Sequence, residues 1–202
     1  ANATAATGSV PSAATSYVTD GLLLHLDAGD SDSYSGSGTT WYDLTDNSYD
    51  FTLSGSPTHD STTGSFDFQS GKKATNTNTI TSTLGAVEAW FQLPGNSATG
   101  ARAIGAAENR WVLMGNLTSA TSNESIELHA NSAPTMQYQN GHNFFDTTNN
   151  WNHVVAVVDG SANKWYVNGN PVTPAFRLGN ASSTGPIWDG DANAVGAFYN
   201  GS

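Results

Sequence analysis

The sequence predicts an all-β fold, a two-sheet antiparallel β-sandwich formed as one domain by the 202-residue chain. Its apolar residues come in short runs, which clusters of Gly, Ser, Thr and Asn separate at intervals of about 8–12 residues. Lys, Arg and Glu are scarce, and the apolar residues do not recur at the 3.6-residue period of an amphipathic helix. Many short strands joined by tight turns are typical of a sandwich, and a chain of this length can bury a sizeable core.

The N-terminal residues differ from the rest of the chain. Residues 1–16 are small and polar and include Pro11, so they have too few apolar side chains to fold alone. We expect a flexible arm over residues 1–16 and the sandwich domain over residues 17–202. The arm has neither the basic start nor the apolar run of a signal peptide, which predicts a processed end or a linker.

The first predicted strand is the apolar run Leu22–Leu26, which follows the turn residues Asp20-Gly21. We expect this strand to be buried and to end at Asp27-Ala28-Gly29. A loop rich in Ser, Gly and Asp should then run to about residue 40.

Alternation of apolar and polar residues predicts the strands that follow. Residues 51–53 and 66–68 each carry two apolar residues at alternate positions, which indicates two half-buried strands. Residues 77–81 are a candidate polar edge strand. Residues 86–93 are a candidate central strand, because alternate side chains of a strand point to opposite faces. One face would carry Ala86, Glu88, Trp90 and Gln92, and the other would carry Val87, Ala89, Phe91 and Leu93.

Further short segments continue the series over residues 102–107, 111–117, 126–130 and 135–139. The clearest local signal is residues 151–172, where a valine-rich run leads into Asp159-Gly160. The aromatic run after it leads into Asn168-Gly169. Both dipeptides favour positive backbone φ, so this region predicts a hairpin and then a second tight turn.

Composition excludes several classes of partner. A formal net charge of −11 with only six Lys and Arg residues leaves almost no cationic surface for phosphates, so we expect no binding to nucleic acid. Acidic glycans and anionic membranes are disfavoured for the same reason, unless a cation bridges the like charges. The chain has no cysteine and no run of about 20 apolar residues, which excludes disulfides and membrane insertion. A neutral glycan or a protein surface fits the charge better.

Several blocks of the sequence occur in a characteristic order, namely Asp20–Gly29, Gly38–Leu44 with Asn47, Ser65–Phe68, Gly85–Phe91, Asn150–Val155 and Trp165–Gly169. Together they resemble laminin-G-like, concanavalin A-like domains found in bacterial surface and bacteriophage virion proteins. The similarity covers most of residues 20–199 and implies a jelly-roll sandwich. The fold itself hosts lectins, adhesion modules, hydrolases and lyases, so it does not fix the function.

The resemblance also predicts how the C-terminal end differs from the family. After Val195–Gly201 the family continues into a final strand beside the first one, whereas this sequence stops at Ser202. We therefore expect a domain that lacks its final strand, or whose edge another segment or chain covers. An open sheet edge would allow assembly with a partner.

Catalytic patterns are not found. A glycoside hydrolase needs two carboxylates on one face, yet Glu occurs only at positions 88, 108, 124 and 127, without alternation along one strand. Tyr138, Gln139 and His142 could suggest a lyase, but Asn140-Gly141 predicts a surface turn between them. His153 is expected to be a packed or hydrogen-bonded structural residue. The sequence therefore predicts a protein that is not an enzyme.

Calcium is the one cofactor that the sequence suggests. Asp27, Asp30 and Asp32 alternate in a flexible loop and could supply the oxygen ligands that this cation prefers. Residues 189–193 form a second candidate cluster, and Asp43 with Asp46 and Asn47 forms a third. Asp and Asn side chains also bond the backbone in turns, so a structural role stays open for each cluster. The resemblance favours the structural role for Asp43.

Sugar recognition requires an exposed aromatic face beside polar groups that bond the hydroxyls. The best constellation is Trp188 with Asp189, Asp191 and Asn193, although Trp188 could equally be a core residue. Tyr34 and His142 are further candidates. The remaining tryptophans fall in strand-like positions and are expected in the core, namely Trp41, Trp90, Trp111, Trp151 and Trp165.

Two functions fit these observations. The first is a non-catalytic glycan-recognition or adhesion module at the surface of a cell or virion, hence extracellular. The second is a structural coat or decoration domain of a virion or surface assembly, held through its arm and open edge. A glycan-active enzyme is a third alternative, which the missing carboxylate pattern disfavours.

Overall fold

The computed structural model confirms the all-β fold. Its described residues form strands β1 to β16 and no helix, and all the strand pairings are antiparallel. The predicted arm over residues 1–16 lies outside the described residues. The structure describes residues 17–68, 71–78, 80–82, 85–92, 100–107, 111–118, 123–130, 133–140, 150–158, 164–172, 188–190 and 193–195.

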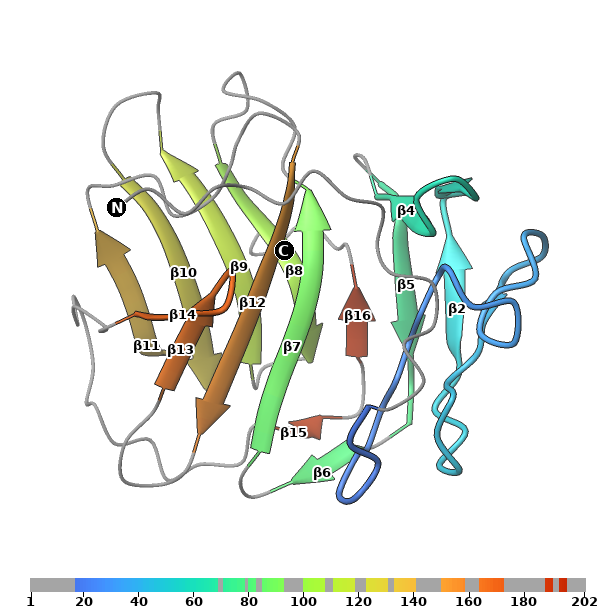
Figure 1. Ribbon diagram of the computed structural model, residues 1–202, viewed down its shortest axis with the longest axis horizontal. Coiled ribbons are helices and arrows are strands. Elements are labelled where there is room, and N and C mark those ends of the chain that lie inside the picture. The colour runs from blue at the N-terminus through green and yellow to red at the C-terminus, as the bar shows by residue number, and fades with distance from the viewer. Residues whose placement is uncertain are drawn as a thin grey trace.

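Two main sheets build the sandwich. The larger has eight strands in the order β1 (Thr40–Trp41), β2 (Phe51–Ser54), β5 (Lys73–Asn76), β16 (Asn193–Val195), β8 (Gly100–Ala107), β9 (Trp111–Thr118), β10 (Asn123–Ala130) and β11 (Ala133–Asn140). The smaller has the order β14 (Asn170–Val172), β13 (Lys164–Val167), β12 (Trp151–Val158) and β7 (Gly85–Gln92). In Figure 1 the four-stranded sheet lies in front of β8 to β11, and β2 and β5 extend the larger sheet to one side.

Two short strand pairs complete the architecture. β15 (Trp188–Gly190) pairs with β6 (Ile80–Ser82), and β3 (Thr58–Asp60) pairs with β4 (Ser65–Asp67). β16 lies between β5 and β8 in the larger sheet, so a C-terminal segment joins the N-terminal strands to the rest. The residues after Val195 lie outside the described ranges, so the expectation that the domain lacks its final strand stays a prediction.

The prediction of a buried strand over Leu22–Leu26 is wrong. These residues are half-buried and form no strand. The backbone of His25 forms its hydrogen bonds with Asp43 and Leu44 and not with a neighbouring strand. The backbone N–H of His25 donates to Oδ1 of Asp43 at 2.9 Å, and the carbonyl of His25 accepts from the N–H of Leu44 at 2.9 Å. Leu24 and Leu26 still pack against the core beside β1 and β2.

The core of this N-terminal part is aromatic. Phe51 and Leu53 of β2 are both buried, which confirms the strand predicted there. Trp41 packs edge-on against Phe66 with 4.9 Å between ring centroids, and Tyr34 packs against the same ring at 4.7 Å. Edge-to-face pairs of this kind add about 0.5–1.5 kcal/mol each to the area that they bury.

The smaller sheet buries one face and exposes the other. Val154 and Ala156 of β12 and Trp165 of β13 are at most 1% exposed, so alternate residues of these strands fill the space between the sheets. In β7 the residues Ala86, Glu88, Trp90 and Gln92 are exposed and their neighbours are half-buried, as the alternation predicted. The outer face of this sheet is therefore available to solvent.

Candidate functional site

The register between β7 and β12 places three chemically active side chains together on the outer face. Trp90 of β7 lies directly opposite His153 of β12, and Glu88 lies opposite Val155. Glu88, Trp90 and His153 thus form one group, which we call the outer-face triad. Its members project outward because they occupy alternate positions of strands whose other residues face the interior.

Trp90 is the exposed aromatic member of the triad. Its relative exposure is 48%, and one face of its indole stacks on the ring of His153, with 4.4 Å between centroids and 22° between planes. The prediction that Trp90 belongs to the core is therefore wrong. The same prediction is confirmed for Trp41 and Trp165, which are 8% and 1% exposed. Trp151 is half-buried on the outer face, and the side chain of Trp111 lies outside the described residues.

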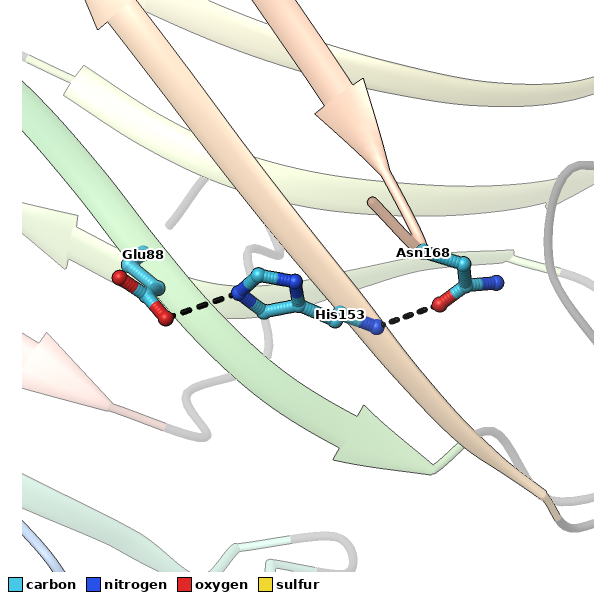
Figure 2. Close-up of polar contacts among 3 residues, drawn as sticks. All are labelled: Glu88, His153 and Asn168. Atoms are coloured by element: carbon cyan, nitrogen blue, oxygen red, sulfur yellow. Dashed lines mark hydrogen bonds and ion pairs between the residues drawn. The ribbon is translucent and has the colours of Figure 1, made fainter. Parts of the chain in front are cut away.

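His153 joins the triad to the neighbouring turn, as Figure 2 shows. Its Nε2 lies 2.8 Å from Oε1 of Glu88, and since a carboxylate only accepts hydrogen bonds, Nε2 is the donor. Its backbone N–H donates to Oδ1 of Asn168 at 2.8 Å, and its carbonyl accepts from the N–H of Asn168 at 2.8 Å. His153 is thus a hydrogen-bonded structural histidine, as predicted.

The turn that supplies Asn168 has the geometry that its sequence favours. Asn168 and Gly169 have φ values of 49° and 76°, and they link β13 to β14 in a tight hairpin. Two consecutive positive φ angles define the type I′ turn that Asn-Gly favours. The sequence therefore predicted the position of this turn, and the turn fixes the backbone of His153.

The rest of the outer face is mostly apolar. Tyr166 of β13 lies opposite Val155, and both are half-buried. Glu88 is the single acidic residue in the described strands of this sheet, and its side chain is 62% exposed. The triad can offer an aromatic surface and a hydrogen-bonding carboxylate, but these strands provide no second carboxylate for a hydrolytic pair.

The predicted sugar site around Trp188 is only partly described. Trp188 and Asp189 lie in β15 opposite Ser82 and Thr81, whereas Asn193 begins β16 in the larger sheet. The structure thus assigns them to two different sheets, and their side chains lie outside the description. Asp191 and His142 also lie outside the described residues. A ligand-binding role for these residues stays a prediction.

Tyr34 requires a correction. It is only 8% exposed, its ring packs against His59 and Phe66, and its hydroxyl donates to the carbonyl of Gly38 at 3.3 Å. A buried ring cannot stack on a sugar, so Tyr34 is a core residue. Its neighbours in sequence are polar, and only the tertiary contacts with distant residues reveal its burial.

The aspartates of the predicted calcium loop bond the backbone of their own turns. Oδ1 of Asp27 accepts from the N–H of Gly29, and Oδ1 of Asp30 accepts from the N–H of Asp32, both at 2.8 Å. Throughout the described ranges, no three acidic, histidine or cysteine side chains are grouped so that they could hold a metal ion. The geometry of this loop is that of turn capping, and calcium binding stays a prediction.

Asp43 has the structural role that the resemblance favours. It is 9% exposed, and its Oδ1 accepts from the backbone N–H groups of His25 and Thr45. Its Oδ2 accepts from the Thr45 hydroxyl at 2.7 Å and from the N–H of Tyr49 at 3.0 Å. These four bonds hold three segments of the N-terminal region together.

The two antiparallel sheets define an all-β sandwich protein. The chain belongs to the concanavalin A-like lectin/glucanases superfamily, since the family model matches residues 60–202. This match confirms the resemblance read from the sequence. No curated protein matches the chain. No helix long and apolar enough to cross a membrane occurs in the part of the chain that the structure describes.

Two solved structures match part of the chain at low structural similarity. One is the carbohydrate-binding module CBM66 from Bacillus subtilis, with a TM-score of 0.36 and 16% identity, covering 62% of this chain and 82% of that chain. The other is domain 4 of AbnA, a GH43 extracellular arabinanase from Geobacillus stearothermophilus, in complex with arabinotriose. It has a TM-score of 0.39 and 15% identity, and covers 80% of this chain and 78% of that chain.

Proposed function

We propose that this protein is a non-catalytic glycan-recognition module whose ligand binds at the outer-face triad of Glu88, Trp90 and His153. The proposal rests on the exposed indole of Trp90, whose orientation is fixed by stacking on the ring of His153. A pyranose ring presents an apolar face of C–H groups, which packs on an exposed aromatic ring. A fixed ring loses little conformational freedom when the ligand arrives, so more of the contact energy appears as affinity.

Glu88 supplies the polar contact that such a site requires. Its side chain is 62% exposed, and its position is held from one side by the bond between Oε1 and His153. Oε2 can accept from a sugar hydroxyl, in a charge-assisted hydrogen bond stronger than a neutral one. Glu88 and Trp90 are two residues apart on one strand, so their Cα atoms are about 7 Å apart and one sugar ring can reach both side chains.

Recognition is favoured over hydrolysis by the number of carboxylates on this face. Hydrolases with a carboxylate pair place the two groups about 5–10 Å apart across the scissile bond. Glu88 has no acidic neighbour on the described strands of its sheet. The family includes lectins and glucanases alike, and the single carboxylate supports the lectin side.

The net charge of −11 supports a neutral ligand, because an acidic polysaccharide would be repelled by the domain as a whole. Polymers of neutral sugars occur on cell and virion surfaces and in extracellular material. We therefore propose that this module acts outside the cell.

The proposal is tested with an array of neutral and acidic glycans, probed with the unmodified protein and two variants. Trp90→Ala should lower the affinity for the bound neutral glycan at least tenfold. Tyr42→Ala is the matched control, because Tyr42 is also 48% exposed but lies beside β1 of the larger sheet. Tyr42→Ala should bind as the unmodified protein does.

Two outcomes would overturn the proposal. One is an array on which no glycan is retained, which would favour the coat or decoration role. The other is a glycan that binds equally well to Trp90→Ala and to the unmodified protein, which would move the site to another surface. Thermal unfolding of both variants ensures that a loss of binding does not reflect a loss of the fold.

A further inference from the structure

Among the described strands, β7 pairs only with β12, and the hydrogen bonds of His153 show which backbone groups of β7 point to its other side. Both the N–H and the carbonyl of His153 bond to Asn168, which lies on the β13 side. The backbone N–H and carbonyl of one strand residue point to the same side of the strand. The N–H and carbonyl of His153 therefore both point toward β13 and away from β7. His153 and Trp90 are consequently a non-hydrogen-bonded pair, in which side chains lie closest together. The ring separation of 4.4 Å agrees with this.

The backbone N–H and carbonyl of Trp90 then point away from β12, toward the other side of β7. The backbone N–H and carbonyl of Glu88 also point away from β12, because backbone groups of residues two apart on a strand point to the same side. Glu88 lies opposite Val155, two residues from His153. Among the described strands none pairs with β7 on this side. With respect to the described strands, this edge therefore presents hydrogen-bond donors and acceptors in a fixed row.

The free face of the Trp90 indole looks toward the same edge. Its other face is covered by His153, the residue directly across the strand pair, and the two rings are within 22° of parallel. The uncovered face must therefore point away from β12. An apolar surface, an N–H and a carbonyl, all from Trp90, meet on the side of β7 where no described strand pairs, and Glu88 lies two residues along the same strand.

From this juxtaposition we infer that the glycan ligand carries 2-acetamido sugars, bound edge-on to β7 with the acetamido group at Trp90. This inference rests on the proposed function and names the ligand class of the same site. An acetamido group is a peptide unit, so its carbonyl can accept from the Trp90 N–H as an added strand would. Its methyl group lies against the indole, and a ring hydroxyl donates to Glu88. The group is uncharged, as the acidic protein requires.

The decisive experiment compares two oligosaccharides with the same β-1,4 backbone, one of 2-acetamido-2-deoxyglucose and one of glucose. They differ only at C2 of each ring. Isothermal titration of the full chain should give about tenfold tighter binding of the acetamido oligomer, from one hydrogen bond and one buried methyl group. Equal affinities would overturn the ligand class and leave the proposed function standing. If neither the acetamido nor any other glycan bound, the proposed function would fail as well.

An NMR titration tests the edge geometry directly. The amide resonance of Trp90 should shift when the acetamido oligomer is added, because its N–H gains an acceptor. The amide of Ala89 is the internal control, since it points toward β12 and lies opposite Val154 within the sheet. An acetamido oligomer that bound without moving the Trp90 amide would overturn the edge-on arrangement.

Discussion

The indole of Trp90 and the imidazole of His153 stack 4.4 Å apart on the outer face of the smaller sheet, although they are 63 positions apart in the sequence. The stack orders an exposed tryptophan that would otherwise sample several rotamers. Three contacts fix His153 in turn, one to Glu88 and two to Asn168. The site is therefore supported by a turn that need not touch the ligand.

The first prediction concerns this support. His153→Ala should reduce glycan affinity roughly three- to tenfold, because stacked aromatic pairs are worth about 0.5–1.5 kcal/mol and Trp90 must then be ordered by the ligand itself. His153→Phe keeps a ring beside Trp90 and loses the bond to Glu88, so it should recover most of the affinity. Titration calorimetry measures both. An alanine variant with unchanged affinity would show that the stack does not prepare the site.

The second prediction concerns the stability contributed by Asp43. Asp43→Ala should lower the free energy of unfolding by about 3 kcal/mol, because three backbone N–H groups and one hydroxyl lose their acceptor in a largely buried place. Asp32→Ala is the control, since Asp32 is exposed and should change the stability by less than about 0.5 kcal/mol. Urea unfolding of the two variants and of the unmodified protein measures the differences in the free energy of unfolding. Equal midpoints would contradict the structural role of Asp43.

The third prediction separates steric overlap from backbone strain at two glycines. Gly55 and Gly71 have φ values of 74° and 81°, so alanine is strained at both, by roughly 1–2 kcal/mol. A Cβ at Gly55 would also overlap the carbonyl oxygen of Gly71, whereas a Cβ at Gly71 would meet nothing within 4 Å. Gly55→Ala should thus destabilise the protein clearly more than Gly71→Ala in thermal unfolding. The reverse order would refute the close approach of these two segments.

The fourth prediction concerns Asp60, whose pKa is lowered chiefly by the hydrogen bond from the backbone N–H of Thr62, and also by the Thr63 side chain. Both bonds favour the charged carboxylate. Because the folded pKa is depressed, the stability that this group contributes is present above its ordinary pKa and is lost as the pH falls through the lowered value. An NMR titration of Asp60 should give a pKa below the ordinary value.

Thr63→Ala is the matched variant for that titration. It removes the side-chain bond and should move the pKa of Asp60 part of the way back, while the bond from Thr62 remains. A pKa of Asp60 at its ordinary value in the unmodified protein would contradict the turn geometry between β3 and β4.

The sequence by itself determined the features that depend on neighbouring residues. The alternation over residues 86–93 separated the outer from the inner face of β7, and Asn168-Gly169 placed the turn, because both depend on local backbone geometry. The aromatic run of β13 was also read correctly as a strand with a buried Trp165. The blocks that resemble the family identified the sandwich.

Only the tertiary structure decided which side chains meet. Trp90 and Trp165 were both expected in the core as strand tryptophans, but Trp90 faces solvent and Trp165 faces the space between the sheets. Leu22–Leu26 resembles a strand, yet Asp43 and Leu44 bind its backbone instead of a strand ladder. Strand pairing brings Glu88 and His153 within 2.8 Å across 65 positions of sequence, and no local pattern encodes such a contact. The candidate site follows from the register of two strands, which long-range packing fixes.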